Sequence, residues 1–322
     1  MCSKKKPTVN QHIVPQAYLR RFATLTENKN YQIGVGIRKK DGRNFFATTQ
    51  SVKNVGFVKN VYEFDCRKDT PNYWENYFAE VIEPFCGTEL SNIISNIESS
   101  QNAAVVLSHE DKCNLSVFIC HQIFRSPQAL EKSIQIGQKS IERGKKEAQS
   151  MLKSSFPPFL HSLLLNALDN ADFSKDEIKD IFMQSMSDVN RQEERTNALL
   201  DKIWIVYQNT TQLQFITSDN PVCRKNCVTK SFSFEDNTLK DPNSLILFPL
   251  SPTILIEITP SHLLGSRPQK YDGRKFLLGQ NDLSFIAGAD TLQILQCHRQ
   301  VFMSLNMLQH LDELSKASKI ND

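Results

Sequence analysis

The sequence predicts a single α+β domain, with a predominantly helical middle and a small, mainly antiparallel sheet formed by an N-terminal hairpin and C-terminal strands. Three observations lead to this prediction. Residues 31–49 alternate apolar and polar side chains, helical spacing dominates 72–200, and short β-branched runs return from 204 onward. Strands grouped towards the two ends of the chain favour α+β over an alternating βαβ fold.

The N-terminal segment is predicted to contain a short helix within Gln11–Phe22, where apolar residues recur at helical spacing. Pro15 falls in its first turn, where a residue without a backbone N–H is tolerated. A hairpin follows, in which 31–37 alternate with period two, 40–42 form the turn and 43–49 return.

The middle of the chain is predicted to be a series of helices. Pro84 kinks or splits the first one, because proline removes a backbone hydrogen bond and clashes with the preceding turn. Ser108 caps the second, with acidic residues in the first turn where the helix dipole favours them. A capping box at Ser174–Glu177 starts the last. In order, the predicted helices cover 72–100, 109–126, 128–153, 159–168 and 175–200.

The C-terminal third contains short apolar and β-branched runs followed by one helical stretch. The first two runs, 204–208 and 214–217, are predicted to pair as a hairpin. Two longer strands and a final helix are predicted at 245–250, 253–258 and 290–314.

The composition is that of an ordinary globular protein, with 40% hydrophobic and 23% charged residues among 322. A chain of this length can bury a sizeable core. We expect a flexible N-terminus at 1–9, the domain at 10–315 and a flexible tail at 316–322.

The formal net charge of +3 does not by itself indicate nucleic-acid binding, which requires a concentrated basic surface. Basic residues do cluster at Lys4–Lys6 and between 139 and 146. A phosphate-bearing ligand or a nucleic acid therefore stays among the expected partners. A membrane does not, because no stretch has the ~18 apolar residues that span a bilayer.

The eight cysteines include no Cys-x-x-Cys pair, and the closest two, Cys223 and Cys227, have no second pair to complete a zinc site. Scattered cysteines are typical of a reducing compartment. Because the N-terminus also lacks the apolar core of a signal peptide, we expect a cytoplasmic protein.

Two polar residues fall on the apolar stripe of the helix that Ser108 starts. Gln122 projects into the centre of the stripe and Arg125 borders it. A buried amide needs hydrogen-bond partners, and a buried arginine needs an anion. Either Gln122 is a satisfied core amide and Arg125 belongs to a structural ion pair, or both residues line a polar cleft in which Arg125 binds a carboxylate or phosphate.

The second signal is the polar run Thr217–Asn220, which follows a strand and is closed by Pro221. Sites tend to be built where strands run into loops. The alternative is an Asx-turn that merely ends the strand, which is the commonest use of Asp and Asn.

His12 and the glutamates of the first long helix are the remaining candidates. A histidine needs a neighbouring carboxylate or metal to act as a base or ligand. Glu80 and Glu83 share one helix face, whereas Glu75 lies at the edge of the apolar stripe. No Gly-rich phosphate loop, His-x-x-x-His pair or Gly-x-Ser-x-Gly elbow occurs in the sequence.

Five segments carry these residues in a fixed order. They are 11–22 (His-x-x-Pro-x-x-Tyr-Leu-x-x-Phe), the glutamates Glu75 and Glu83, Gln122-x-x-Arg125-Ser126-Pro127, Thr217–Val222 and Phe248–Pro252. Over roughly 10–310 the chain resembles the bacterial family named domain of unknown function 4238, with Ser126 in place of the usual threonine. The family has no established activity. The resemblance implies a role for particular residues of these motifs: His12, Tyr18, Glu75, Gln122, Arg125, Asp219 and Asn220.

The first functional hypothesis is a hydrolase that acts on a phosphate-bearing substrate, such as a nuclease. His12 would be the general base or a metal ligand, and Glu75 and Asp219 would hold a divalent ion. Arg125 would stabilise the developing charge. The catalytic set is then His12, Gln122, Arg125, Asp219 and Asn220, and the binding set is Tyr18, Glu75 and Ser218.

The second hypothesis is a non-catalytic binding or sensing protein, for example of a bacterial defence or toxin system. The polar motif residues would then form a satisfied structural network that fixes the fold. The sequence leaves open whether the protein is an enzyme, which metal it would use and what its oligomeric state is. It also leaves open whether 128–170 protrudes as an interaction arm.

Overall fold

The computed structural model describes residues 9–42, 44–155, 157–170, 173–232 and 238–310. Most of the N-terminus predicted to be flexible, the whole 316–322 tail and the end of the predicted last helix lie outside these ranges. Within them the α+β class and the helical middle of the chain are confirmed.

The larger sheet is built from the C-terminal part of the chain. Its strand order is β11 (Arg274–Leu278), β6 (Ile203–Asn209), β10 (Ile254–Thr259), β9 (Ser244–Ser251) and β8 (Cys223–Asn226). β11 runs parallel to β6, and the other neighbours are antiparallel. The strands predicted at 245–250 and 253–258 are β9 and β10, and they pair as a hairpin with a register shift near Ile254.

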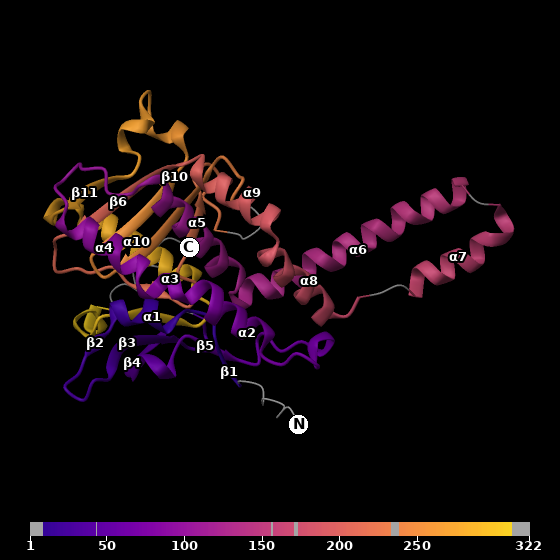
Figure 1. Cartoon of the computed structure of the whole chain (residues 1–322), viewed down its shortest axis with the longest axis horizontal. Coiled ribbons are helices and arrows are strands. Elements are labelled where there is room, and N and C mark those ends of the chain that lie inside the picture. The colour runs from indigo at the N-terminus through magenta and orange to yellow at the C-terminus, as the bar shows by residue number, and fades with distance from the viewer. Residues whose placement is uncertain (1–8, 43, 156, 171–172, 233–237, 311–322) are drawn as a thin grey trace.

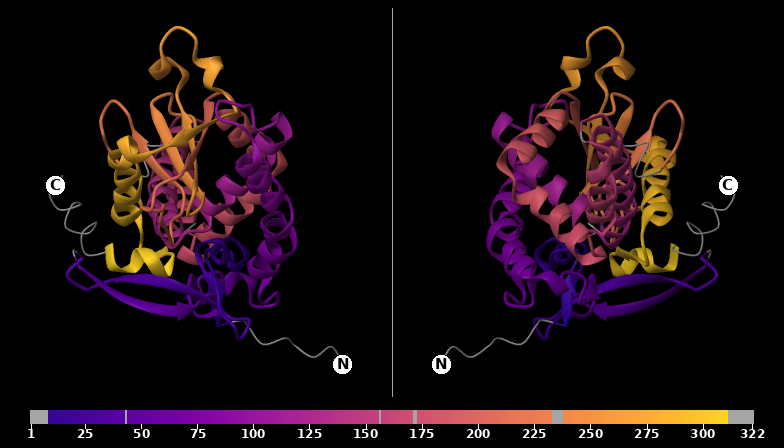
Figure 2. Two further views of the ribbon diagram at one scale, coloured as in Figure 1. Left: turned by 90° about the vertical axis from the view of Figure 1, so that its left-hand side faces the viewer. Right: turned by 90° about the vertical axis from the view of Figure 1, so that its right-hand side faces the viewer.

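The N-terminal hairpin belongs to a second sheet, at the lower edge of the molecule in Figure 2. β3 (Tyr31–Arg38) pairs with β4 (Phe45–Ser51) on one side, and with β2 (Thr24–Leu25) and β12 (Gln300–Met303) on the other. β12 also pairs with β7 (Thr217–Ser218). A separate two-stranded ladder joins β1 (Asn10–His12) to β5 (Phe57–Lys59). The hairpin thus shares a sheet with two short C-terminal strands, β12 and β7. The predicted strands at 204–208, 245–250 and 253–258 lie instead in the larger sheet, so the single small sheet of the prediction is divided in two.

The predicted hairpin between 204–208 and 214–217 is wrong. β6 pairs with β10 and β11 in the larger sheet, whereas β7 pairs with β12 in the smaller one. Asn209 closes a tight turn, and its side chain contacts the main chain at Thr211 and Leu213. The chain therefore leaves one sheet and enters the other between these two strands.

The helices of the middle follow the prediction, including a break near Pro84, with additional breaks at Thr88 and Asp188. Pro84 lies in the first turn of α3, after a π-helical turn at Phe78–Ile82. Asp188 splits the predicted 175–200 helix, because its side chain caps the backbone N–H of Arg191 and starts a new helix. The helices are α1 (Gln16–Leu19), α2 (Tyr73–Tyr77), α3 (Glu83–Gly87), α4 (Glu89–Ser99), α5 (His109–Phe124), α6 (Pro127–Ser155), α7 (Pro158–Asn170), α8 (Lys175–Ser187) and α9 (Val189–Leu200).

The predicted final helix is misplaced. α10 spans Leu283–Gln296, and strand β12 follows it within the segment predicted to be helical. Cys297 has an extended backbone, which ends the helix, and His298–Gln300 are fixed by the Asp219 side chain. The helix therefore begins seven residues earlier than predicted and ends where a tertiary contact takes over.

The core lies on both faces of the larger sheet (Figures 1 and 2). Alternate strand residues such as Phe248 and Ile256 pack with Phe118 of α5 in the main cluster. Residues of the opposite parity, such as Leu247 and Leu255, pack with α10 in a smaller cluster. α5 is thus a central helix, and the Ser108–Asp111 capping box predicted at its start is present.

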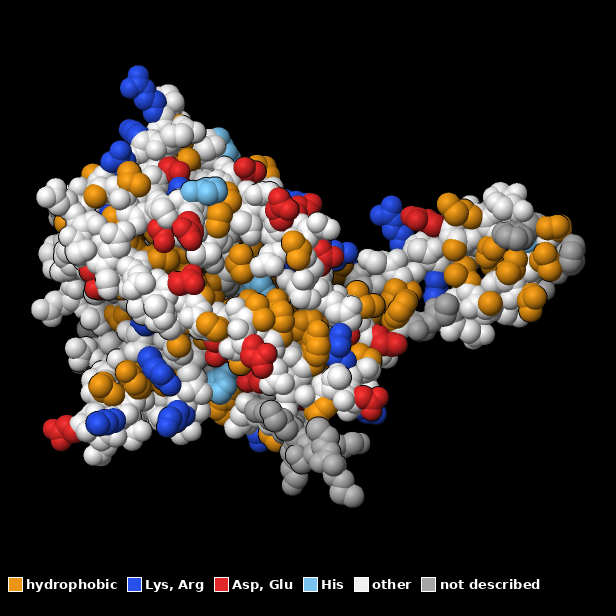
Figure 3. All heavy atoms as spheres, viewed as in Figure 1, with side chains coloured by type: hydrophobic (Ala, Val, Ile, Leu, Met, Phe, Trp, Pro, Cys, Tyr) orange, Lys and Arg blue, Asp and Glu red, His pale blue; other side chains and the backbone are white. Residues whose placement is uncertain are grey.

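α6 and α7 form a helical hairpin that stands away from the rest of the molecule (Figure 1). Between 134 and 170 no described residue is buried, and hydrophobic side chains cover much of the visible end of the hairpin in Figure 3. The arm left open by the sequence therefore does protrude. Among the described residues, no helix combines the length and the apolarity needed to cross a membrane.

Candidate functional site

His12 lies at the end of β1, facing helix α2. It pairs with Phe57 in the β1–β5 ladder, and the chain then turns at Pro15 into α1. One turn later the Gln16 amide N–H donates to Nε2 of His12, at 2.9 Å. Nδ1 of His12 lies 3.8 Å from Oε1 of Glu75, and each side chain is 19% exposed. Because a glutamine nitrogen can only donate, the imidazole proton belongs on Nδ1, facing the carboxylate.

The Arg125 guanidinium is completely buried beside this pair. Its Nη2 donates to the backbone carbonyl of His12 and lies 3.6 Å from Oε1 of Glu83. The guanidinium carbon lies 4.2 Å from the centroid of the Phe78 ring. The Tyr62 hydroxyl donates to the Arg125 carbonyl oxygen at 2.7 Å, and burial raises the pKa of Tyr62 to about 12. Within the described part of the chain, Nε and Nη1 of Arg125 have no hydrogen-bond partner.

Gln122 lies one turn before Arg125 on α5 and is only 1% exposed. Neither atom of its amide has a hydrogen-bond partner among the described residues, and the same holds for Oε2 of Glu75. Eleven buried side-chain nitrogen and oxygen atoms of the described residues lack a hydrogen-bond partner, and five of them belong to Gln122, Arg125 and Glu75. We refer to these three residues together with His12 as the His12 cluster.

Unpaired polar atoms are costly inside a protein, at about 1–3 kcal/mol for each buried group. Native proteins therefore pair nearly all of them, with other protein groups or with water. In the His12 cluster the described residues supply too few partners for the side chains of Glu75, Gln122 and Arg125. Bound water, or a ligand that offers both donors and acceptors, would supply such partners.

Asp219 is placed differently, as an anchor for the start of β12. Its Oδ1 accepts the backbone N–H of His298 at 2.8 Å, and its Oδ2 accepts those of Arg299 and Gln300 at 2.7 and 2.8 Å. The Asp219 N–H donates to the Gln300 carbonyl oxygen in return. Burial raises the pKa of Asp219, and the three N–H groups oppose that shift. Both carboxylate oxygens are thus occupied by the main chain.

Ser218 and Asn220 are tied to the end of α10. The Ser218 hydroxyl donates to Oε1 of Gln293 at 2.7 Å, and the amide of Gln293 donates to the Pro221 carbonyl. The Asn220 amide donates to the carbonyl oxygen of Gln296 at 3.1 Å. These residues hold the loop after β7 against a helix and a strand that follow it by more than 70 residues.

Tyr18 connects the N-terminal motif to the two C-terminal ones. Its hydroxyl shares a hydrogen bond with Thr217 at 2.8 Å and donates to the carbonyl oxygen of Pro249 at 2.6 Å. Its ring stacks on Phe248, with centroids 5.5 Å apart. Burial raises its pKa well above the usual 10.0. The other four motifs of the sequence therefore all contact the segment from His12 to Tyr18.

The predicted site residues fall into two groups with separate partners. His12 contacts both Glu75 and Arg125, and Gln122 lies one turn before Arg125, whereas Ser218–Asn220 bond to α10 and to the start of β12. The sequence did not identify the partners Gln16, Glu83 and Tyr62 as site residues. Glu83 was named in the second motif and among three spaced glutamates, but without a role, and Gln16 was visible only as part of the first motif.

The donor set does not fit a metal ion. Among the described residues, no three His, Cys, Asp or Glu side chains are grouped so that they could hold one. Glu75 lies with His12, but the oxygens of Asp219 are taken up by backbone N–H groups. A metal shared by Glu75 and Asp219 therefore gains no support from the geometry.

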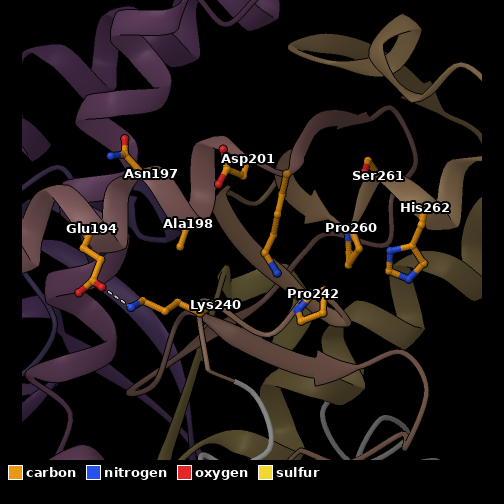
Figure 4. Close-up of a pocket in the computed structure, with 10 residues that line it drawn as sticks. Glu194, Asn197, Ala198, Asp201, Lys240, Pro242, Pro260, Ser261 and His262 are labelled. Carbon is orange, nitrogen blue, oxygen red and sulfur yellow. Dashed lines mark hydrogen bonds and ion pairs between the residues drawn. The ribbon is translucent and has the colours of Figure 1, made fainter.

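A separate hollow of about 500 Å³ lies beside α9 and contains none of the predicted residues (Figure 4). A Glu194–Lys240 ion pair lies on one side of it and His262 on the other. Lys202 also lines it, but its amine donates to the carbonyl oxygens of Asp241 and Ser244 at 2.8 and 2.7 Å. Burial lowers the pKa of Lys202 to about 8. Its main role is to fasten the turn before β9.

Comparison with known proteins identifies the family. Residues 10–304 match the family described as "Protein of unknown function (DUF4238)", which covers most of the chain, and the protein belongs to this family. No curated protein and no solved structure matches the chain.

Proposed function

We propose that this member of the DUF4238 family is a hydrolase of phosphate-bearing substrates, with His12 as its general base. The observation that carries the proposal is the concentration of unpaired buried polar atoms on Glu75, Gln122 and Arg125, next to a histidine–carboxylate pair. A phosphoryl group offers acceptor oxygens to the free donors of Arg125 and Gln122. Active sites commonly hold such preorganised donors where negative charge develops.

His12 has the features of a general base. Glu75 faces its Nδ1 proton and would stabilise the imidazolium that forms when Nε2 takes up a proton. Nε2 accepts from Gln16 in the free protein, so an attacking water must replace that amide. The 19% exposure of both His12 and Glu75 gives water a route to the pair.

The proposal favours a small phosphate ester over a long polynucleotide. The basic run 139–146 lies on α6, roughly 20–30 Å along the helix from Arg125 at 1.5 Å per residue. A polynucleotide would have to extend along α6 to contact both the basic run and the His12 cluster. A phosphate monoester or a short diester needs only the His12 cluster.

The test is hydrolysis of phosphate monoesters and diesters by the purified protein and by two variants. We expect His12→Gln to lower kcat by about 10²-fold or more, the usual contribution of a general base, with an unchanged melting temperature. His109→Gln is the matched control, because His109 is exposed at the start of α5. Failure of the wild type to hydrolyse any ester, or full activity of His12→Gln, would refute the proposal.

A non-catalytic binding or sensing role is the second candidate. It is favoured by the Ser218–Asn220 group, whose polar side chains are bonded within the protein as in a structural network. In that case the His12 cluster would bind a ligand without turning it over. Ligand-induced stabilisation with no hydrolysis would distinguish this role from catalysis.

A further inference from the structure

A second hollow, of about 590 Å³, lies on the face of the larger sheet that α10 covers. This is the face opposite to α5, because its residues belong to the smaller core cluster with Leu247 and Ala289. Figure 2 shows α10 in yellow beside the orange strands. The volume falls within the range of small-molecule sites, about 300–1,000 Å³.

The walls of this hollow are mainly apolar and partly aromatic. Phe285, Leu292 and Leu295 come from α10, Leu247 from β9, and Phe232 from the segment after β8. Phe232 is 41% exposed, so its ring is accessible at the edge of the hollow. Apolar walls with a few polar groups are the common composition of ligand pockets.

Gly288 leaves room in the wall formed by α10. A Cβ atom at this position would meet no atom within 4 Å, so the helix surface there faces open space. Glycine in the middle of a helix costs roughly 0.5–1 kcal/mol relative to alanine. The chain thus keeps a destabilising residue at a point where a side chain would fit and would fill the hollow.

Glu257 supplies a polar group to the floor of the hollow. It lies in the middle strand β10, between Leu247 and Ile205, and is 9% exposed. The side chains of Tyr207 and Thr259 lower the pKa of this carboxyl, against the larger effect of burial. Burial raises the pKa of Glu257 to about 7, so that near neutral pH its carboxyl can either accept or donate a hydrogen bond.

Two lysines add positive charge to the lining. Lys225 lies in β8, and its Nζ is 5.8 Å from the centroid of the Phe232 ring. Lys230 is exposed, and its Nζ donates to the carbonyl oxygen of Cys227 at 2.6 Å. An ammonium group beside an aromatic ring favours a ligand that combines negative charge with a flat apolar body.

We propose that this hollow binds a small aromatic anion whose ring system carries a hydrogen-bonding group. The anionic group would meet Lys225 and Lys230, the rings would pack between Phe232 and Phe285, and the hydrogen-bonding group would reach Glu257. A purely aliphatic acid fits less well, because its tail would leave the buried carboxyl facing only hydrocarbon. This site is independent of the His12 cluster and of the hydrolase activity proposed for it.

The probe for the test is 8-anilinonaphthalene-1-sulfonate, which has a sulfonate, aromatic rings and one N–H group. We expect saturable binding of one dye per chain by the native full-length protein, followed by fluorescence titration and calorimetry. Nucleoside monophosphates, which combine the same features, serve as competitors. The variant Gly288→Phe fills the hollow from a position without a neighbouring atom, and should abolish binding with its circular dichroism unchanged.

The charge requirement is tested with Lys225→Glu, which should weaken binding about tenfold or more, roughly the effect of one lost charged contact. Lys39→Glu, an exposed change in the turn after β3, is the matched control and should bind like the wild type. Equal binding by the wild type and Gly288→Phe would overturn the proposal, and so would the absence of saturable binding to the native wild type.

Discussion

Glu257 should make the folded state less stable as the pH rises. Its pKa is raised from the usual 4.5 to about 7 by burial, so the folded protein binds this proton more tightly than the unfolded chain. The contribution of Glu257 to the free energy of unfolding is fully present below pH 4.5. It falls by about 3 kcal/mol as the pH rises to 7. Tyr207, Cys227 and the two lysines of the hollow face the same carboxyl.

The measurement is urea unfolding between pH 4.5 and 8. The difference in unfolding free energy between Glu257→Gln and the wild type should move in favour of the variant as the pH rises. A difference that stays constant across this range would show that Glu257 titrates normally.

His121 has the opposite pH dependence. Burial lowers its pKa to about 4, and its neutral ring bonds to the Val117 carbonyl and the Tyr77 hydroxyl. The unfolded chain therefore binds the proton more tightly, and stability is lost as the pH falls from 6.5 towards 4, again by about 3 kcal/mol. His121→Gln should lose less of its stability than the wild type over this interval. Parallel acid-unfolding curves for the two proteins would contradict this.

At the scale of elements, Asp219 is expected to hold β12 in place. Asp219→Ala would leave three partly buried N–H groups of residues 298–300 without their charged acceptor, and should cost about 3 kcal/mol or more. Hydrogen exchange should accelerate at these amides before it does in β9 and β10. A loss below about 1 kcal/mol, with exchange unchanged, would mean that the strand is held by its ladder alone.

Elements with strong local signals could be predicted from the sequence, and those fixed by distant contacts could not. The capping box at Ser108 and the alternation in β3 are local, and both were predicted correctly. β12 is short, and it pairs Met303 with Gly34 across most of the chain. Its sequence continues an apolar pattern after α10, so local reasoning extended the helix through it.

The candidate site also combines features that local patterns predict with features that depend on distant contacts. The position of Gln122 in the apolar stripe predicted its burial, because helix geometry fixes that from spacing alone. The contact between His12 and Glu75 depends on β1 pairing with β5, which no local pattern indicated. The partners Gln16 and Glu83 could only be recognised once that ladder was known.

At the scale of the whole molecule, the α6–α7 arm should be dispensable for folding. No described residue between 134 and 170 is buried, although Gly137 packs closely on Ile178 at its base. Replacing 141–168 with a short glycine–serine linker should change the unfolding free energy by less than about 1 kcal/mol. A larger loss, or a melting temperature that depends on concentration only when the arm is present, would show that the arm is covered by another chain.

The central claim is that the His12 cluster lacks partners that a phosphate-bearing ligand supplies. The most direct measurement is the melting temperature of the wild type and of Gln122→Met, with and without inorganic phosphate and phosphate esters. Gln138→Met, an exposed change on α6, is the control for the substitution itself. Our account predicts that the ligand stabilises only the wild type and the control. It also predicts that Gln122→Met alone melts no lower than the wild type, because it removes an unpaired buried amide. A Gln122→Met protein that melts early, together with no ligand effect on the wild type, would show instead that Gln122 belongs to a satisfied structural network.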